Sequence, residues 1–261
     1  MRDTFVKLKT IADLQNESAK FYIDAYQRGY RWTENEVRDL LDDIREFSHV
    51  KRQDDCTFYC LQPIIVTQAE DGVSCKVIDG QQRLTTLMIF FKVLCLKKNE
   101  NRLFERDFRL EDDTIVLQHG RNDISAFDTV MRQDKLEEIP NVMPASQIIS
   151  AFNYFLKKIE PDKLDRNIIK QNVQFVCIDL LDGEDEQQVF DTINSLGVRL
   201  TTAELLKNYF YNKDNVQEYE KNWVAIFEKD SETRLYWEQE LETGRIKRSL
   251  IDIFFDAYFQ I

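Results

Sequence analysis

The sequence predicts an α+β fold in which a few strands are embedded in a mostly helical domain. Glycine (7) and proline (4) are both scarce among the 261 residues, so few tight turns can form and a many-stranded β-sandwich is disfavoured. Long stretches carry apolar residues at helical spacing, whereas only short runs are rich in β-branched residues. The 18 Phe, 10 Tyr and 3 Trp supply enough large apolar side chains for a sizeable core.

The composition argues against several classes of protein. Hydrophobic residues make up 43% and charged residues 31%, which is typical of a folded chain. No apolar run is long enough to cross a membrane, and no secretory signal follows the N-terminus. The net charge of −12 gives no support to general nucleic-acid binding. Five cysteines without C-x-x-C pairs and only two histidines indicate buried thiols in a reducing cytoplasm, and argue against a His-rich metal site.

Local signals predict the elements of the first hundred residues. A T-x-x-E capping box at Thr33 begins a helix over residues 33–47. Two runs rich in β-branched residues, 63–67 and 75–79, flank Asp71-Gly72 and predict a β-hairpin. Directly after the second strand, apolar residues at helical spacing predict a helix with one apolar face.

The elements after residue 98 are less regular. In order, the sequence predicts short helices and loops over 99–145, a helix capped by Ser146 that stops near Pro161, a third strand over 173–179, a helix from Glu184, a helix capped by Thr201, and a helical, aromatic tail from about Gln217.

Two parts of the chain are expected. One is a domain over residues 1–211 with a helical insertion around 99–170, and the other is a helical C-terminal extension over 212–261. The last residues, 253–261, are so apolar that we expect the chain to be cut inside or just before a further domain.

The most informative stretch is V-I-D-G-Q-Q-R-L-T-T at residues 77–86. Its predicted context is a strand, a tight turn at Gly80 and a helix start, where unpaired backbone N–H groups and the helix dipole favour an anion. Glycine lets the backbone approach a ligand closely. Arg83 adds a fork of N–H donors suited to phosphate, and Gln81 and Gln82 offer neutral donors and acceptors. The spacing is not that of a Walker P-loop.

Further side chains of this stretch extend the phosphate hypothesis. Thr85 and Thr86 add hydroxyl groups at the helix start. Asp79, at the end of the strand, is placed to hold Mg²⁺ or to orient a water molecule. A structural interpretation accounts for the same residues equally well: Asp79 caps the helix and Arg83 pairs with a neighbouring acid. Both interpretations stay open at this point.

A second group lies in the loop Y-Q-R-G-Y-R-W at residues 26–32. Arginines among aromatic rings can stack on a base or bind phosphate. This makes Tyr26, Gln27, Arg28 and Arg31 candidate nucleotide-binding residues. Taken alone, the pattern favours aromatic side chains in the core with arginines extended over them.

A third group is F-D-T-I-N-S-L-G-V-R-L-T at residues 190–201. Asn194 lies in its loop, and Lys207 follows about two turns along the next helix. Backbone donors at a capped helix start are again suited to an anion. In isolation, an ordinary corner between two helices is the favoured interpretation.

The three groups together resemble the N-terminal domain of GmrSD-type restriction endonucleases, also called domain of unknown function 262. The signatures occur in the order of that family: Y-Q-R-x-Y-x-W at 26–32, D-G-Q-Q-R-L-T-T-L at 79–87, and F-x-x-I-N-S-x-G-x-x-L-T at 190–201 with the later Lys207. They span most of residues 21–210. Family members often carry a proline shortly before the first block, where this chain has Ile23-Asp24-Ala25.

The resemblance implies a small ParB/sulfiredoxin-like mixed sheet whose strand–turn–helix loop holds nucleotide phosphates. Residues 1–211 would then form a ParB-like NTP-binding domain. Hydrolysis of a nucleoside triphosphate with Mg²⁺ is implied, with Asp79, Gln81, Gln82 and Arg83 as catalytic residues. Asp79 would either hold the Mg²⁺ or position the attacking water. The phosphate- or nucleotide-binding residues would be Gly80, Thr85, Thr86, Tyr26, Gln27, Arg28, Arg31, Asn194 and Lys207.

In such proteins, hydrolysis is coupled to cleavage of modified or foreign DNA in antiphage defence. We therefore expect a cytoplasmic regulatory domain whose partners are a nucleoside triphosphate, DNA at the level of the full protein, a C-terminal or separate His-containing nuclease domain, and a second copy of the chain. Two alternatives stay open. One is a nucleotide-gated DNA sensor without turnover, and the other is an interaction module without nucleotide binding.

Overall fold

The computed structural model describes most of the chain, which divides into two compact units. The described residues are 5–16, 20–25, 27–51, 59–68, 74–120, 123–142, 145–180, 203, 206–207, 210–211, 216–243 and 246–259. The N-terminal unit comprises residues 1–25 and 29–184, and the C-terminal unit comprises residues 26–28 and 185–261. The units divide at residue 184, and the domain boundary predicted at 211 stays a prediction.

The N-terminal unit is built on a mixed sheet whose six described strands lie in the order β1-β6-β3-β4-β2-β5. The β1–β6 and β3–β4 pairs are antiparallel, whereas β3–β6, β2–β4 and β2–β5 are parallel. The strands are β1 (Phe5–Thr10), β2 (Lys20–Tyr22), β3 (Tyr59–Gln68), β4 (Ser74–Asp79), β5 (Leu117–Gln118) and β6 (Val173–Leu180). The β3–β4 pair confirms the predicted hairpin, whose Asp71-Gly72 turn lies outside the described residues.

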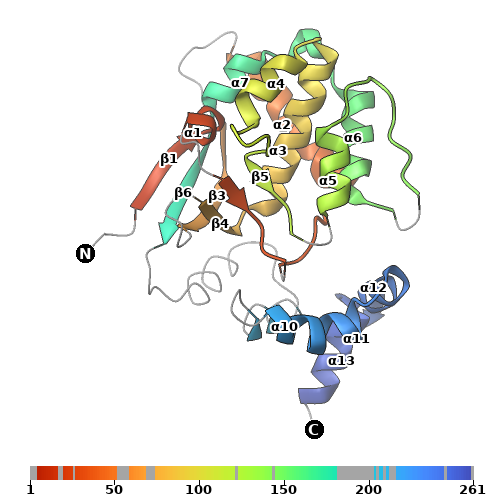
Figure 1. The fold of residues 1–261 in the computed structure, drawn as a ribbon. Coiled ribbons are helices and arrows are strands. Elements are labelled where there is room, and N and C mark those ends of the chain that lie inside the picture. The colour runs from red at the N-terminus through yellow and green to blue at the C-terminus, as the bar shows by residue number, and fades with distance from the viewer. Residues whose placement is uncertain are drawn as a thin grey trace. The chain divides into compact units, whose positions relative to one another are not determined.

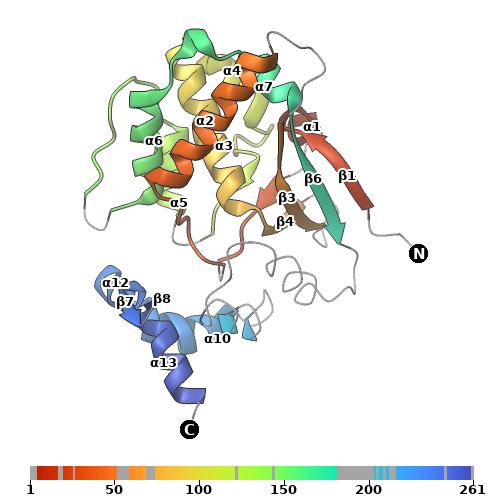
Figure 2. The same cartoon turned by 180° about the vertical axis from the view of Figure 1, so that it is seen from behind.

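Helices α2 to α6 lie together on one side of this sheet, as two opposite views show (Figure 1 and Figure 2). The helical segments of the unit are α1 (Ile11–Asn16), α2 (Glu34–Lys51), α3 (Gln81–Lys97), α4 (Asn101–Phe108), α5 (Ile124–Met131), α6 (Gln147–Lys158), the 3-10 turn η1 (Pro161–Lys163) and α7 (Arg166–Asn172). The predicted capping box of α2 is confirmed, because the Thr33 N–H donates to Glu36 Oε2 at 2.7 Å.

Helix α3 is buried around its whole circumference. Every side chain from Leu84 to Leu96 is buried, and consecutive residues point 100° apart, so no side of the helix faces water over this stretch. Phe90 packs edge-on against Phe155 of α6, with ring centroids 5.8 Å apart. The prediction of a single apolar face is therefore wrong: tertiary packing surrounds the helix with α4, α5, α6 and α7.

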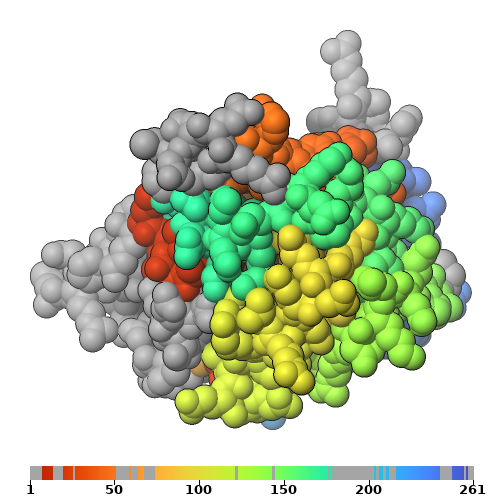
Figure 3. Space-filling view, turned by 90° about the horizontal axis from the view of Figure 1, so that it is seen from above, coloured from red at the N-terminus to blue at the C-terminus, as the bar shows by residue number. Residues whose placement is uncertain are grey.

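A buried carboxylate joins α4 to α7. The Asp107 side chain has no exposed surface, and its Oδ2 atom contacts both the Arg166 guanidinium and the Lys170 ammonium, the latter at 2.8 Å. Arg106 donates to Oδ1 of the same carboxylate at 2.8 Å. The space-filling view shows α7 directly against α4 on this face of the unit (Figure 3). Neither segment carried a sequence signal for this pairing.

The C-terminal unit has its own aromatic core. Trp223 stacks on Phe255 with ring centroids 5.6 Å apart, and Tyr219 and Phe227 are buried beside it. The described elements are α10 (Val216–Tyr219), the π-helical turn η3 (Glu220–Val224), α11 (Ala225–Phe227), α12 (Ser231–Glu238), the antiparallel strands β7 (Glu240–Thr243) and β8 (Ile246–Ser249), and α13 (Leu250–Phe259). The helical, aromatic tail is confirmed, whereas the β7–β8 hairpin had not been predicted.

The other predicted elements have mixed outcomes. The third strand is confirmed as β6, and the short helices between 99 and 145 as α4 and α5. The helix after Ser146 is confirmed as α6, but its N-cap residue Ser146 makes no side-chain capping hydrogen bond. The helix expected from Glu184 lies outside the described residues. Within the described ranges, no helix combines the length and hydropathy that crossing a bilayer requires.

We predict that Asp107→Asn destabilises the N-terminal unit by about 3–5 kcal/mol at neutral pH, since it removes the buried negative charge that Arg166 and Lys170 share. Burial raises the pKa of Asp107, but hydrogen bonds and charges from Lys170, Arg106 and Arg166 outweigh burial and hold the pKa below its ordinary value. The stabilisation is therefore complete above about pH 4 and is lost as pH falls through the depressed pKa.

Urea unfolding of both proteins between pH 3 and 7 measures this effect. The difference in the free energy of unfolding between wild type and Asp107→Asn should become smaller toward pH 3. The exposed Asp113→Asn variant (its side chain is 88% accessible) serves as the control and should match wild type. If the difference in the free energy of unfolding stays constant across the pH range, the stabilisation does not come from an ionised Asp107.

Candidate functional site

The turn between β4 and α3 requires glycine for two independent reasons. Gly80 has φ of +100°, in the left-handed region that favours glycine. A Cβ at this position would lie 2.9 Å from Cγ1 of Ile64 on β3. Gly80 is also the N-cap residue of α3 and has no side chain to cap the helix. The first N–H groups of α3 are therefore not satisfied by their own N-cap residue, which is the arrangement that favours an anion.

The two charged residues of the motif pair with each other across this turn. Arg83 Nη2 lies 2.7 Å from Asp79 Oδ2, and both side chains are partly accessible, at 12% and 28%. The structural interpretation of the sequence is thus correct in one respect, since Arg83 pairs with a neighbouring acid. The pair joins the end of β4 to the first turn of α3, so an incoming anion would compete with Asp79 for the guanidinium.

Gln82 fastens the loop of the first sequence block to the start of α3. Its Oε1 atom accepts hydrogen bonds from the backbone N–H groups of Arg31 and Trp32, at 2.7 and 3.2 Å. Its Nε2 atom donates to the Gly29 carbonyl at 3.1 Å. The Gln82 side chain is buried, and three bonds to one loop make it a clamp. This clamp places the backbone of the exposed residue Arg31 beside the turn that carries Arg83.

Tyr30 strengthens the same junction. Its hydroxyl lies 2.7 Å from Thr86 Oγ1, and Thr86 in turn donates to the Gln82 carbonyl at 2.7 Å. The Tyr30 N–H donates to Asp123 Oδ2 at 2.6 Å. Burial raises the pKa of the Tyr30 phenol, so the hydroxyl stays protonated and available as a donor. Thr86, predicted as a phosphate ligand, is fully buried in this network.

The other predicted hydroxyl, Thr85, contacts a buried histidine. Thr85 donates to the Gln81 carbonyl at 2.7 Å, and its Oγ1 lies 3.0 Å from His119 Nε2. Burial lowers the pKa of His119 to about 3, so the imidazole is neutral at physiological pH. Asp123 Oδ2 lies 3.9 Å from His119 Nδ1, so one carboxylate borders both the imidazole and the Tyr30 loop.

His119 and Asp123 lie beside the motif, which the sequence did not predict. His119 is one of only two histidines, which is a usable signal, but the scarcity of histidine by itself argues only against a His-rich metal site or a His-containing nuclease centre in this chain. Asp123 carried no signal, because its role depends on the fold bringing residues 29–30 and 123 together.

The remaining predicted site residues lie outside the described residues or in the C-terminal unit. Tyr26 and Asn194 lie outside the described residues, and Gln27 and Arg28 group with the C-terminal unit. Lys207 is buried in that unit, where Nζ pairs with Glu228 Oε1 at 2.7 Å. Tyr219 and Trp223 donate to the same carboxylate. A phosphate would therefore have to displace Glu228 before Lys207 could bind it.

The donor set at the turn limits which metal it suits. Among the described residues, no group of three or more His, Cys, Asp or Glu side chains converges to form a metal site. Asp79 supplies a single carboxylate, which fits Mg²⁺ held largely by phosphate oxygens and water. It does not fit an ion that requires a full set of protein ligands.

Comparison with known proteins adds one family match. Residues 9–211 match the family model described as "GmrSD restriction endonuclease, N-terminal domain". A comparison with curated proteins found no match. The family match ends at residue 211, beyond the division between the two structural units, so it covers all three sequence groups.

We predict that Gln82→Leu loosens the junction between the Gly29–Trp32 loop and α3. Leucine has a similar size but leaves the Arg31 and Trp32 N–H groups and the Gly29 carbonyl without their partner, which costs about 1–3 kcal/mol. Hydrogen exchange at the Arg31 and Trp32 amides should accelerate in the variant. Gln81→Leu is the matched control and should leave both exchange rates unchanged. Equal rates in wild type and Gln82→Leu would contradict the clamp.

Proposed function

Because this chain belongs to the family of GmrSD restriction endonuclease N-terminal domains, we propose that it binds a nucleoside triphosphate at the Asp79–Arg83 turn and hydrolyses it. The domain would serve as the regulatory part of a cytoplasmic defence nuclease that acts on modified or foreign DNA. The nuclease domain would be supplied by a C-terminal or separate segment, and DNA and a second copy of the chain would be partners of the full protein.

One observation carries the proposal. The left-handed Gly80 turn leads directly into α3, whose N-cap residue supplies no side-chain cap, and Arg83 in the first turn of the helix pairs with Asp79. A helix N-terminus beside a guanidinium is complementary to a polyphosphate in both charge and hydrogen bonding. The buried body of α3 keeps this end of the helix in place, so little reorganisation is needed on binding.

The residues of the motif divide into two roles. Arg83 and the N–H groups at the start of α3 bind phosphate oxygens, and Gln81, which is half-buried at the turn, contacts phosphate or the attacking water. Gln82 positions the Gly29–Trp32 loop and does not contact the phosphates, because its amide group is hydrogen-bonded to that loop. Through this loop it holds Arg31 near the phosphates as a second cation.

Binding frees Asp79 for a second task. In the structure its Oδ2 atom pairs with Arg83, and a triphosphate would take over the guanidinium because it carries more negative charge. The released carboxylate then holds Mg²⁺ or orients water. Bound Mg²⁺ would neutralise charge that develops on the phosphate oxygens.

A nucleotide-gated DNA sensor without turnover is the second candidate. It is favoured because residues of the motif already have partners within the protein: Arg83 pairs with Asp79, and the Gln82 side chain accepts a hydrogen bond from a backbone N–H group. In that case the exchange of Asp79 for phosphate would itself be the signal. An interaction module that binds no nucleotide is the third, and the retained Asp79–Arg83 block argues against it.

We predict Mg²⁺-dependent phosphate release by the wild-type chain and a loss of about 100-fold in Arg83→Ala, a typical cost of removing a charge-stabilising donor. Arg38→Ala, at an exposed position of α2, is the control and should retain full activity. Saturable calorimetric binding without phosphate release would instead establish the sensor. Equal turnover in wild type and Arg83→Ala would remove Arg83 from the mechanism.

A further inference from the structure

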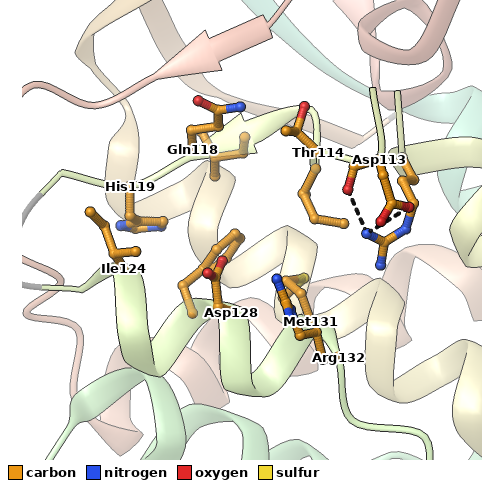
Figure 4. A pocket seen from close by; sticks show the side chains of 12 residues that line it. Asp113, Thr114, Gln118, His119, Ile124, Asp128, Met131 and Arg132 are labelled. Atoms are coloured by element: carbon orange, nitrogen blue, oxygen red, sulfur yellow. Dashed lines mark hydrogen bonds and ion pairs between the residues drawn. The ribbon is translucent and has the colours of Figure 1, made fainter. Parts of the chain in front are cut away.

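A cavity of about 300 Å³ lies between α5 and the chain segment from Arg109 to His119, wholly within the N-terminal unit. Figure 4 shows its lining side chains from close by. The volume is at the lower end of the range for small-molecule pockets. Asp79 and Arg83 do not line it. His119 does, and its hydrogen bond to Thr85 links the wall of the cavity to the first turns of α3.

The floor of the cavity is apolar and buried. Leu117, Phe127 and Met131 line it, and all three are buried in the core. Phe127 also packs against the His119 ring, with centroids 4.4 Å apart. Ile124 lines the cavity while remaining 46% accessible, which places it where the floor meets solvent. A ligand with apolar faces would be desolvated against this surface.

The rim carries a carboxylate and a guanidinium that do not pair with each other. Asp128 and Arg132 lie one turn apart on the α5 side, a spacing at which such residues commonly form an ion pair. Both are exposed, and Figure 4 shows both among the labelled lining residues. Within the part of the chain that the structure describes, neither side chain has a hydrogen-bond or ion-pair partner. One acceptor and one donor group are therefore open to a ligand.

The remaining polar groups lie on the opposite wall and leave the cavity without excess charge. Arg109 is paired with Glu105 and Asp113, so it is not a spare cation. Gln118 and the neutral His119 imidazole add polar groups on the strand side. Polar groups thus surround an apolar floor on two sides, which fits a neutral ligand better than an anion.

We propose that this cavity binds a neutral planar heterocycle with a hydrogen-bond donor beside an acceptor along one edge, namely a nucleobase or its nucleoside. Such a ring presents apolar faces to Phe127 and Met131 and a polar edge to Asp128 and Arg132. Asp128 accepts from a ring or exocyclic N–H group, and Arg132 donates to a ring carbonyl or nitrogen. An aliphatic ligand would leave the polar groups on both walls unmatched.

This inference does not rest on the nucleotide site proposed above. A nucleoside has no phosphate for the Gly80 turn, so its binding can be measured separately. Calorimetric titration of the full chain with adenosine, guanosine, cytidine and uridine in turn tests the proposal. At least one should bind saturably at or below about 1 mM, and Asp128→Ala/Arg132→Ala should weaken that binding by about tenfold or more.

Controls separate this cavity from the rest of the molecule. Arg38→Ala/Asp39→Ala removes an exposed charge pair on α2 and should leave nucleoside binding unchanged. Ile124→Trp, at an accessible lining position, should block the cavity and abolish binding. The proposal is overturned if none of the four nucleosides binds, or if binding survives both cavity variants. It is equally overturned if binding is lost in Arg83→Ala but kept in the cavity variants.

Discussion

The burial of α3 on all sides is the constraint on which the rest of the N-terminal unit depends. A helix surrounded by packed side chains cannot rotate or slide without opening cavities. Its first turn, the Gly80 turn and the end of β4 are therefore held in one geometry, with Ile64 closing the space above Gly80. An anion site at the end of such a helix would be preorganised, which supports the proposal that the Asp79–Arg83 turn binds phosphate.

The motif at residues 79–86 has a structural role beside its proposed catalytic one. Gln82, Thr85 and Thr86 direct their polar groups to the backbone, Tyr30 and His119. Only Asp79, Gln81 and Arg83 keep accessible side chains at the turn. The same stretch thus joins two distant segments of the chain and presents a small accessible surface at the turn. If the proposed activity is lost on substituting Gln82, the loss would reflect positioning rather than contact with substrate.

Local signals predicted most of what depends on neighbouring residues. The Thr33–Glu36 capping box, the β3–β4 hairpin and the Gly80 turn could be read from spacing and residue type. Strands β1 and β2 and the β7–β8 hairpin were not predicted, because strand pairing depends on tertiary contacts that local sequence patterns do not record. The approach of His119 and Asp123 to the motif, and the pairing of Lys207 with Glu228, follow from tertiary packing that no single segment encodes.

The most direct test of the account is the response of the backbone amides of Gln81, Gln82 and Arg83 to a non-hydrolysable triphosphate analogue with Mg²⁺, followed by NMR. The account predicts saturable shifts at these three amides and at the Arg83 side chain as it leaves Asp79. Binding that saturates without moving them, or an absence of any binding, would contradict a phosphate site at the start of α3.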